Sequence, residues 1–273
     1  MRGEGVRALG LALPPQRMPR LRGTRPLKRW RYVGYYAPDL MLCVADARIG
    51  PVPQRWWAVA HPDGTLRERN GIGRGGIDLS GSRVRLRAGD VRLDLALEET
   101  GGVEIVSPAG SDGDYIWTRK QAGVPARGVL VVEGRRTEID GVVFIDDSAG
   151  YHPRHTAWKW SAGTGLTTDG AAVSWNLVTG VHDAEGASER TVWVDGEPRE
   201  IGPVAFAPDL SSVTFHEGGG LEFAEWSARE EHVNLLLMRS DYRQPFGTFA
   251  GTLPGGIELA QGYGVMEEHD VRW

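Results

Sequence analysis

One short segment of the chain concentrates residue types that can transfer protons. Positions 146 to 161 hold two acids, two histidines, one arginine, one tyrosine and two tryptophans. Asp146 and Asp147 form a pair of carboxylates, and burial or mutual repulsion can raise the pKa of one of them until it protonates an apolar substrate. His152 or His155 can relay protons near neutral pH. We therefore predict these four residues as candidate catalytic residues.

The same segment allows two other interpretations. His152 and His155 have a spacing that can ligate a metal together with an acid, but the sequence does not show three well-placed ligands. We accordingly predict neither a metal nor a cofactor. Alternatively, the segment is a polar network that holds two halves of the chain together, and this interpretation stays open beside proton chemistry.

Aromatic and polar residues in and after this segment are candidates for binding a ligand. Trp158, Trp160 and Trp175 can form an apolar wall whose ring faces stabilise a developing positive charge. Trp193 can line a cavity or fill a core, and Arg154 can anchor a polar end of the ligand. The predicted ligand-binding residues are Tyr151, Arg154, Trp158, Trp160, Trp175, Asn176, Arg190 and Trp193.

Two further polar groups have open interpretations. Asn176 and Arg190 lie among apolar strands, and a buried polar group needs a partner, so we expect a contact between Glu189 and Arg190 inside a barrel. Residues 267–270 form a second acidic cluster close to the end of the chain. This cluster either faces the junction or solvates the end of a strand, and the second interpretation is favoured.

The elements that must position these residues are β-strands. Polar and apolar residues alternate over 83–87 and 91–97, which gives each strand one buried and one wet face. Asp-Gly pairs at 63–64, 112–113, 140–141, 169–170 and 195–196 predict tight hairpin turns. The single weak helix candidate lies near 227–231. The fold class is therefore all-β and antiparallel.

An internal repeat organises the strands. Trp30-Arg31-Tyr32 recurs as Trp158-Lys159-Trp160, and 128–147 matches 251–270 with Asp147 over Asp270. Each copy has about eight strand candidates, enough to close a barrel that holds one small ligand. We predict a basic, proline-rich strap over 1–27, a first lipocalin-like barrel over 28–147 and a second over 148–273.

Composition and charge exclude several classes of protein. The 273 residues are 41% hydrophobic and include 10 tryptophans, too apolar and aromatic for a disordered chain, and no apolar run is long enough to span a membrane as a helix. Cys43 is the only cysteine, which we assign to the core. We expect a cytoplasmic protein.

Two features that suggest phosphate or nucleic-acid binding have plainer interpretations. Residues 1–31 hold eight arginines and one lysine against one acid. No nucleic-acid fold signature accompanies them, so a strap across an acidic body is favoured over a binding arm and no nucleic-acid partner is expected. Positions 71–76 match G-x-G-x-x-G, but no helix follows, so we interpret them as a loop.

Several of these segments resemble a bacterial family known only as a domain of unknown function. The resemblance covers about residues 20–273 and is carried by 28–33, 150–161, 175–180, 188–190 and 262–273. More distantly, the chain is similar to a group with two lipocalin-like barrels that includes carotenoid 1,2-hydratase, AttH-like proteins, tocopherol cyclase and certain Diels–Alder cyclases. In the hydratase pattern an acid follows the tyrosine, whereas His152 follows Tyr151 here, so no catalytic residue is carried over.

The resemblance implies an apolar ligand, isoprenoid, lipid or polyketide-like, held in or between the barrels. The first hypothesis is an enzyme that uses an acid to assist hydration, isomerisation or cyclisation. The second is a non-catalytic lipid carrier or stress-related lipid-binding protein with the same cavity. A third, carbohydrate-active β-protein, is suggested by tryptophan platforms and paired acids.

Overall fold

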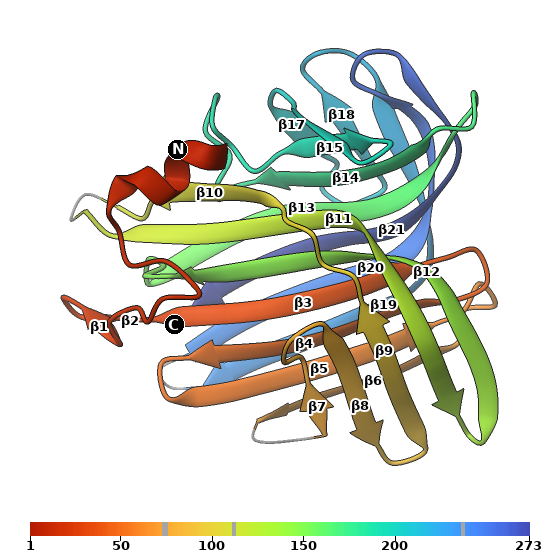
Figure 1. The fold of residues 1–273 in the computed structure, drawn as a ribbon, viewed down its shortest axis with the longest axis horizontal. Helices are drawn as coiled ribbons and strands as arrows, with labels where there is room; N and C mark the ends of the chain where they lie inside the picture. Colours follow the sequence, from red (N-terminus) through yellow and green to blue (C-terminus); the bar gives the residue numbers. More distant parts are fainter. Residues whose placement is uncertain (73–75, 111–112, 236–237) are drawn as a thin grey trace.

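The chain folds into two curved antiparallel β-sheets, as Figure 1 shows for a computed structural model. The structure describes residues 1–72, 76–110, 113–235 and 238–273. The first sheet is ten-stranded and the second is nine-stranded. The predicted fold class, all-β with tandem lipocalin-like barrels, is confirmed. Within the described ranges, no helix is long and apolar enough to cross a membrane.

The first sheet has the strand order β6-β5-β4-β3-β12-β11-β9-β8-β7, with β10 paired to β11. Its strands are β3 (Lys28–Tyr36), β4 (Met41–Ile49), β5 (Val52–Ala60), β6 (Leu66–Ile72), β7 (Ile77–Asp78), β8 (Arg83–Ala88), β9 (Val91–Leu97), β10 (Val103–Pro108), β11 (Tyr115–Val132) and β12 (Arg135–Gly150).

The second sheet has the order β16-β15-β14-β13-β21-β20-β19-β18-β17. Its strands are β13 (His155–Thr167), β14 (Ala172–Thr179), β15 (Thr191–Val194), β16 (Glu197–Glu200), β17 (Val204–Phe206), β18 (Ser212–Phe215), β19 (Gly220–Leu235), β20 (Met238–Leu253) and β21 (Ile257–Arg272). Apart from β10, the two orders follow the same path. The predicted repeat requires this agreement, although the duplication and its domain boundaries stay predictions.

Strand register changes one detail of the predicted repeat. Asp146 on β12 lies opposite Tyr32 on β3, and Glu267 on β21 lies opposite Trp160 on β13. Because Tyr32 matches Trp160 in the repeat, the counterpart of Asp146 is Glu267. The sequence match of Asp147 with Asp270 does not agree with this register, because Asp147 lies opposite Arg31 on β3 whereas Asp270 lies opposite Ala157 on β13.

Three apolar clusters follow from the alternation of side chains along the strands. On β3, Val33 joins a cluster formed entirely by the first sheet, whereas Tyr32 joins a cluster shared by both sheets. A third cluster, which includes Trp175 and Phe249, belongs to the second sheet alone. Each sheet therefore packs its own interior and also presents its opposite face to the other sheet.

The N-terminal segment lies against the first sheet. It comprises a 3-10 helix, η1 (Gly3–Leu9), and a two-strand hairpin of β1 (Leu21–Arg22) and β2 (Arg25–Pro26). Val6, Leu13 and Met18 pack against a cluster that includes Trp117 and Tyr151. Arg7 pairs with Glu104, and Arg22 and Arg25 pair with Asp114.

Several local expectations can be compared with the strands. The Asp-Gly pairs at 63–64, 169–170 and 195–196 form turns, and Cys43 is buried in the core as predicted. The prediction of a turn at 140–141 is wrong, because these residues lie inside β12. The hairpin between β11 and β12 turns at Glu133–Gly134 instead, where φ is positive at both residues. The prediction of a helix near 227–231 is also wrong, because this segment lies within β19. The loop predicted at 71–76 and the turn at 112–113 fall partly outside the described residues.

Candidate functional site

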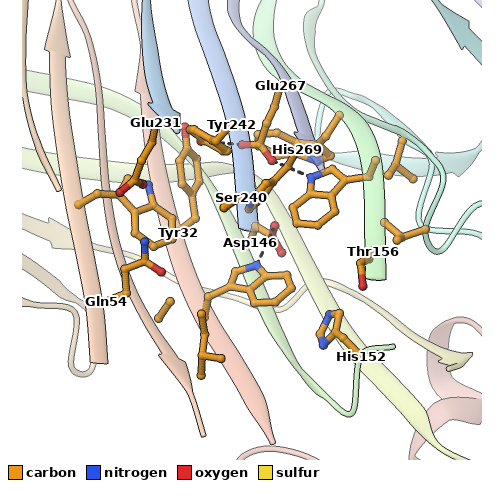
Figure 2. Close-up of a pocket in the computed structure, with 18 of the residues that line it drawn as sticks. Tyr32, Gln54, Asp146, His152, Thr156, Glu231, Ser240, Tyr242, Glu267 and His269 are labelled. Carbon is orange, nitrogen blue, oxygen red and sulfur yellow. Dashed lines mark hydrogen bonds between the residues drawn. The ribbon is translucent and has the colours of Figure 1, made fainter. Parts of the chain in front are cut away.

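A cavity of about 130 Å³ lies between the two sheets. Apolar and aromatic side chains form much of its wall, with Trp30 and Trp56 from the first sheet and Trp158 and Trp160 from the second. Figure 2 labels some of the polar lining residues, among them Asp146, His152 and Glu267. Those of particular interest are Tyr32, Lys120, Asp146, His152, His182, Glu189, Arg229, Tyr242, Glu267 and His269.

Alternation along two central strands turns a carboxylate toward this cavity from each sheet. Asp146 and Phe144 share one face of β12, and Phe144 packs on Trp160 across the sheet interface. On β21, Glu267 and Val265 share a face, and Val265 belongs to the cluster between the sheets. The two carboxylates therefore enter one cavity from opposite sides.

Asp146 belongs to a buried ionic cluster. Lys120 Nζ lies 2.6 Å from Asp146 Oδ1 and 3.3 Å from Glu189 Oε1, and Thr118 Oγ1 donates a hydrogen bond of 2.9 Å to Glu189 Oε2. Burial raises the pKa of Asp146, while Lys120 works against that rise. Burial also opposes the charge of Lys120, but the two carboxylates raise its pKa above the ordinary value. One ammonium thus serves two carboxylates.

Glu267 has a different environment. Its Oε1 accepts a hydrogen bond of 2.8 Å from Trp158 Nε1, and its Oε2 accepts bonds of 2.9 Å from Tyr242 Oη and from Gln244 Nε2. These donors are neutral, and no ion pair to Glu267 occurs within the described residues. Burial raises the pKa of Glu267, against the hydrogen bonds of Trp158 and Tyr242, and the charge of Asp146 adds to the rise.

A buried arginine closes one side of the cavity. Arg229 Nε donates a hydrogen bond of 2.9 Å to Glu68 Oε2, and its Nη1 donates one of 3.3 Å to Gln244 Oε1. The guanidinium lies 5.4 Å from the ring centroid of Tyr242. Gln244 therefore links Arg229 to Glu267 and holds both side chains in place.

The histidines of the cavity are neutral at physiological pH. Burial lowers the pKa of His152 well below its ordinary value and lowers that of His269 to about 4. Both ring nitrogens of His152 lack a hydrogen-bond partner among the described residues, and its ring lies 5.0 Å from that of Trp30. His269 Nε2 lies 2.8 Å from Ser240 Oγ.

The structure brings together four of the predicted site residues and separates the other catalytic candidates. Asp146, His152, Trp158 and Trp160 all line the cavity. Asp147 points to the opposite face of β12, where Arg31 and Arg119 bind it at 3.0 and 2.7 Å, because neighbouring residues of a strand face opposite sides. His155 is exposed at the surface, with Nε2 at 2.9 Å from Asp270 Oδ1.

Most of the predicted ligand-binding residues lie outside the cavity. Tyr151 is buried, with its hydroxyl donating to the Pro19 carbonyl at 2.9 Å, and Arg154 is exposed. Trp175 lies in the core of the second sheet, where it packs on Phe249. Trp193 packs on Phe144 between the sheets but does not line the cavity.

Asn176 and Arg190 are buried and satisfied by neighbours. Asn176 Oδ1 accepts a bond of 2.8 Å from Trp160 Nε1, so this residue orients a cavity wall. Arg190 donates to the carbonyls of Asp183 and Ala184 at 2.8 and 2.7 Å. The prediction that Arg190 contacts Glu189 is wrong, because Glu189 pairs with Lys120 instead.

Sequence reasoning missed several residues that define the site. Glu267 lay in the acidic cluster at 267–270, and alternation along that strand separates it from Glu268, whose carboxylate pairs with Lys159 at 3.3 Å. Lys120 and Arg229 belong to no recognisable sequence motif. Only their burial at the wall of this cavity distinguishes them from the other lysines and arginines of the chain. Among the residues that the structure describes, no group of three histidine, cysteine or acidic side chains is placed to hold a metal ion.

Fold and cavity together define a protein of two lipocalin-like barrels with a partly open site between the sheets. The chain belongs to the family described as Domain of unknown function (DUF2804), whose model matches residues 68–273. No curated protein matches it significantly.

Two crystal structures share the fold. An AttH-like protein from Nitrosomonas europaea is 15% identical with a TM-score of 0.57, over 95% of this chain and 98% of that one. Kievitone hydratase from Nectria haematococca is 13% identical with a TM-score of 0.56, over 88% of each chain. At these identities the likeness establishes the fold alone.

Proposed function

We propose that the protein binds an apolar small molecule between its two sheets and protonates it. The observation that carries this proposal is the pair of carboxylates, Asp146 and Glu267, which enter one apolar cavity from opposite sheets in different environments. Paired titratable groups with different environments are the usual source of a separate acid and base.

Glu267 is the proposed acid. Its pKa is raised and its hydrogen-bond donors carry no charge, so burial favours the protonated carboxyl. In the proposed step its O–H bond breaks, and the proton forms a C–H bond with the electron pair of a C=C bond. The second carbon becomes positively charged, and Glu267 becomes a carboxylate.

Asp146 and the tryptophans stabilise the resulting cation. In the proposed step Asp146 acts as a carboxylate, because the ammonium of Lys120 at 2.6 Å opposes the rise in its pKa that burial causes, whereas Glu267 has no cation paired with it among the described residues. The faces of Trp30 and Trp158 can add cation–π attraction. Water adds to the cation and returns a proton to the Glu267 carboxylate in hydration, and a neighbouring C–H bond gives up its proton to that carboxylate in isomerisation. In cyclisation a second C=C bond attacks the cation, and the new cation then loses a proton to the same carboxylate.

The size of the cavity limits the reacting part of the ligand. Its volume of about 130 Å³ is close to that of an engineered apolar cavity, roughly 150 Å³, that takes up benzene. One ring or one short branched unit therefore fits beside the carboxylates. Kievitone hydratase has the same fold and is named as a hydratase, which supports a reaction of this class.

Binding is tested first. Organic extracts of the purified protein are examined by mass spectrometry, and the neutral dye N-phenyl-1-naphthylamine is titrated into the protein. A co-purified apolar molecule, or dye fluorescence that Trp160→Ala weakens, supports the cavity as the binding site. A protein that is empty and does not bind the dye contradicts the proposal.

Turnover is tested with the co-purified molecules in D2O. Protonation at carbon incorporates deuterium, which mass spectrometry detects as a mass increase whatever product forms. We expect Glu267→Gln to abolish incorporation while keeping dye binding, and the rate to fall as the pH rises and Glu267 loses its proton. Glu268→Gln is the matched control, because that neighbouring carboxylate pairs with Lys159 outside the cavity.

The same experiment separates an enzyme from a carrier. Binding with no deuterium incorporation by the wild-type protein indicates the carrier. Equal incorporation by wild type and Glu267→Gln overturns the assignment of the acid.

A further inference from the structure

A second cavity, of about 740 Å³, opens on the other face of the first sheet. Arg31 and Asp147 line it, whereas their neighbours Tyr32 and Asp146 line the cavity between the sheets, and Trp30 near the start of β3 borders both cavities. Six arginines line it against three acids: Arg7, Arg29, Arg31, Arg48, Arg55 and Arg119 against Asp46, Asp78 and Asp147.

One row of these charges is balanced. Across five adjacent strands, residues directly opposite one another alternate in sign, in the order Arg55, Asp46, Arg31, Asp147 and Arg119. Arg55 Nη2 lies 2.7 Å from Asp46 Oδ2, and Asp147 binds Arg31 and Arg119 at 3.0 and 2.7 Å. Opposite charges placed across strands in this way stabilise the sheet.

The next row toward the rim is not balanced. Arg29 and Arg48 lie directly opposite one another on β3 and β4, both exposed, and neither forms an ion pair with any residue of the described ranges. Like charges directly opposite across a strand pair are destabilising. Two guanidinium groups side by side therefore offer paired donors to an oxyanion, which relieves their repulsion.

An apolar wall continues this row. Trp117 lies two strands from Arg29, through Ala149, a span of roughly 10 Å at the usual strand spacing. Trp117 is 4% exposed, because Leu13 and Met18 of the N-terminal segment pack in the same cluster, and its indole N–H has no acceptor among the described residues. Buried N–H groups are usually hydrogen-bonded, so this donor is available to an acceptor on a ligand in the cavity. Ile77 and Leu79 line the same cavity.

We propose that this cavity binds an organic oxyanion, with its phosphate or carboxylate group on Arg29 and Arg48 and its apolar body reaching toward Trp117. The proposed site does not use the carboxylates of the proposed function, because Arg29, Arg48 and Trp117 line this cavity and not the one between the sheets. The acids that line it do not repel the ligand strongly, since Asp46 and Asp147 are paired with arginines and Asp78 lies 3.7 Å from Arg85.

Isothermal titration calorimetry tests the proposal with 2-naphthyl phosphate, 2-naphthoate and inorganic phosphate. We expect a naphthyl anion to bind more tightly than inorganic phosphate, because its ring system contacts the apolar wall. We expect added NaCl to weaken binding, since exposed charges are screened. The tighter of the two naphthyl anions identifies the head group.

The chain offers a matched control for the arginine pair. Arg87 and Arg92 also lie directly opposite one another, are exposed, and line neither cavity. The double variant Arg29→Gln/Arg48→Gln should raise Kd by roughly tenfold or more, the loss expected for charge-assisted hydrogen bonds. Arg87→Gln/Arg92→Gln should leave Kd unchanged. Equal Kd in the two double variants, or no binding of either naphthyl anion by the wild-type protein at millimolar concentration, overturns the proposal.

Discussion

Replacing Lys120 by methionine tests the ionic cluster at the centre of the site. Lys120 is 2% exposed and lies 2.6 Å from Asp146 and 3.3 Å from Glu189, which are themselves buried. Methionine keeps the unbranched chain up to the position of Cε and removes the ammonium group. The variant therefore leaves two buried carboxylates without a cation.

The expected loss follows from this geometry. Removing one partner of a buried ion pair typically costs about 3–5 kcal/mol of unfolding free energy. Because Lys120 serves two carboxylates, we expect Lys120→Met to lie near the upper end of this range at pH 7.5. Methionine also fills the space, so a cavity adds little to the loss.

The loss must depend on pH with a definite sign. Burial already raises the pKa of Asp146, and removing Lys120 takes away the main influence that lowers it. The folded variant then binds the proton more strongly than the unfolded chain, whose aspartates titrate near about pH 4. In the Lys120→Met variant the protonated Asp146 therefore contributes stability below about pH 4, and this contribution is lost as the pH rises through the pKa of Asp146 in the folded state. We expect the difference from wild type to be smallest near pH 4.5 and largest at pH 7.5.

Urea unfolding at pH 4.5, 6.0 and 7.5 measures this difference. The control is Lys159→Met, because Lys159 pairs with the exposed Glu268 and donates hydrogen bonds to the carbonyls of Ala207 and Pro208, partners whose loss together costs about 1–2 kcal/mol. The triple variant Lys120→Met/Asp146→Asn/Glu189→Gln should recover much of the stability, since none of the three side chains of this cluster then carries a buried charge. A Lys120→Met variant within about 1 kcal/mol of wild type at pH 7.5, or a loss that is the same at every pH, would refute the reasoning.

Two other substitutions test the walls of the cavity. Asn176→Ala leaves Trp160 Nε1 without its acceptor at 2.8 Å, so we expect a loss of about 1–3 kcal/mol in urea unfolding and weaker binding of N-phenyl-1-naphthylamine; unchanged stability and binding would contradict this role. His152 has a lowered pKa, so the unfolded chain alone takes up its proton below about pH 6.5, and wild type loses stability as the pH falls. His152→Phe should flatten this acid dependence between pH 7.5 and 5, and an identical slope in both proteins would show that His152 is not its source.

Much of the fold could be predicted because alternation is a local signal. The residues of 91–97 are alternately buried and exposed along β9, as their sequence predicts. Turns depend on more than two residues. Asp140-Gly141 has the composition of a turn, but the long ladder between β11 and β12 continues through it and places the turn at Glu133–Gly134. Local turn chemistry was overridden by pairing with a neighbouring strand.

The site was harder to predict because both faces of its strands are covered. Asp146 and Asp147 are equivalent in composition, yet one enters the cavity between the sheets and the other faces the first sheet's interior. No local pattern distinguishes two buried faces. Lys120 and Glu267 join Asp146 only through strand register and sheet packing, which relate distant segments of the chain.

The adjacency of Asp146 and Asp147 has a consequence for the positioning of the site. Asp147 binds Arg31 on β3 and Arg119 on β11, so ion pairs join β12 to both neighbours at the position next to Asp146. On the opposite face, Asp146 takes Lys120 from β11. A carboxylate that stabilises a cation must not move as charge develops, because reorganisation would cost part of the stabilisation. The ion pairs of Asp147 with Arg31 and Arg119 therefore hold β12 in place, and β12 carries on its opposite face Asp146, the carboxylate proposed to stabilise the cation.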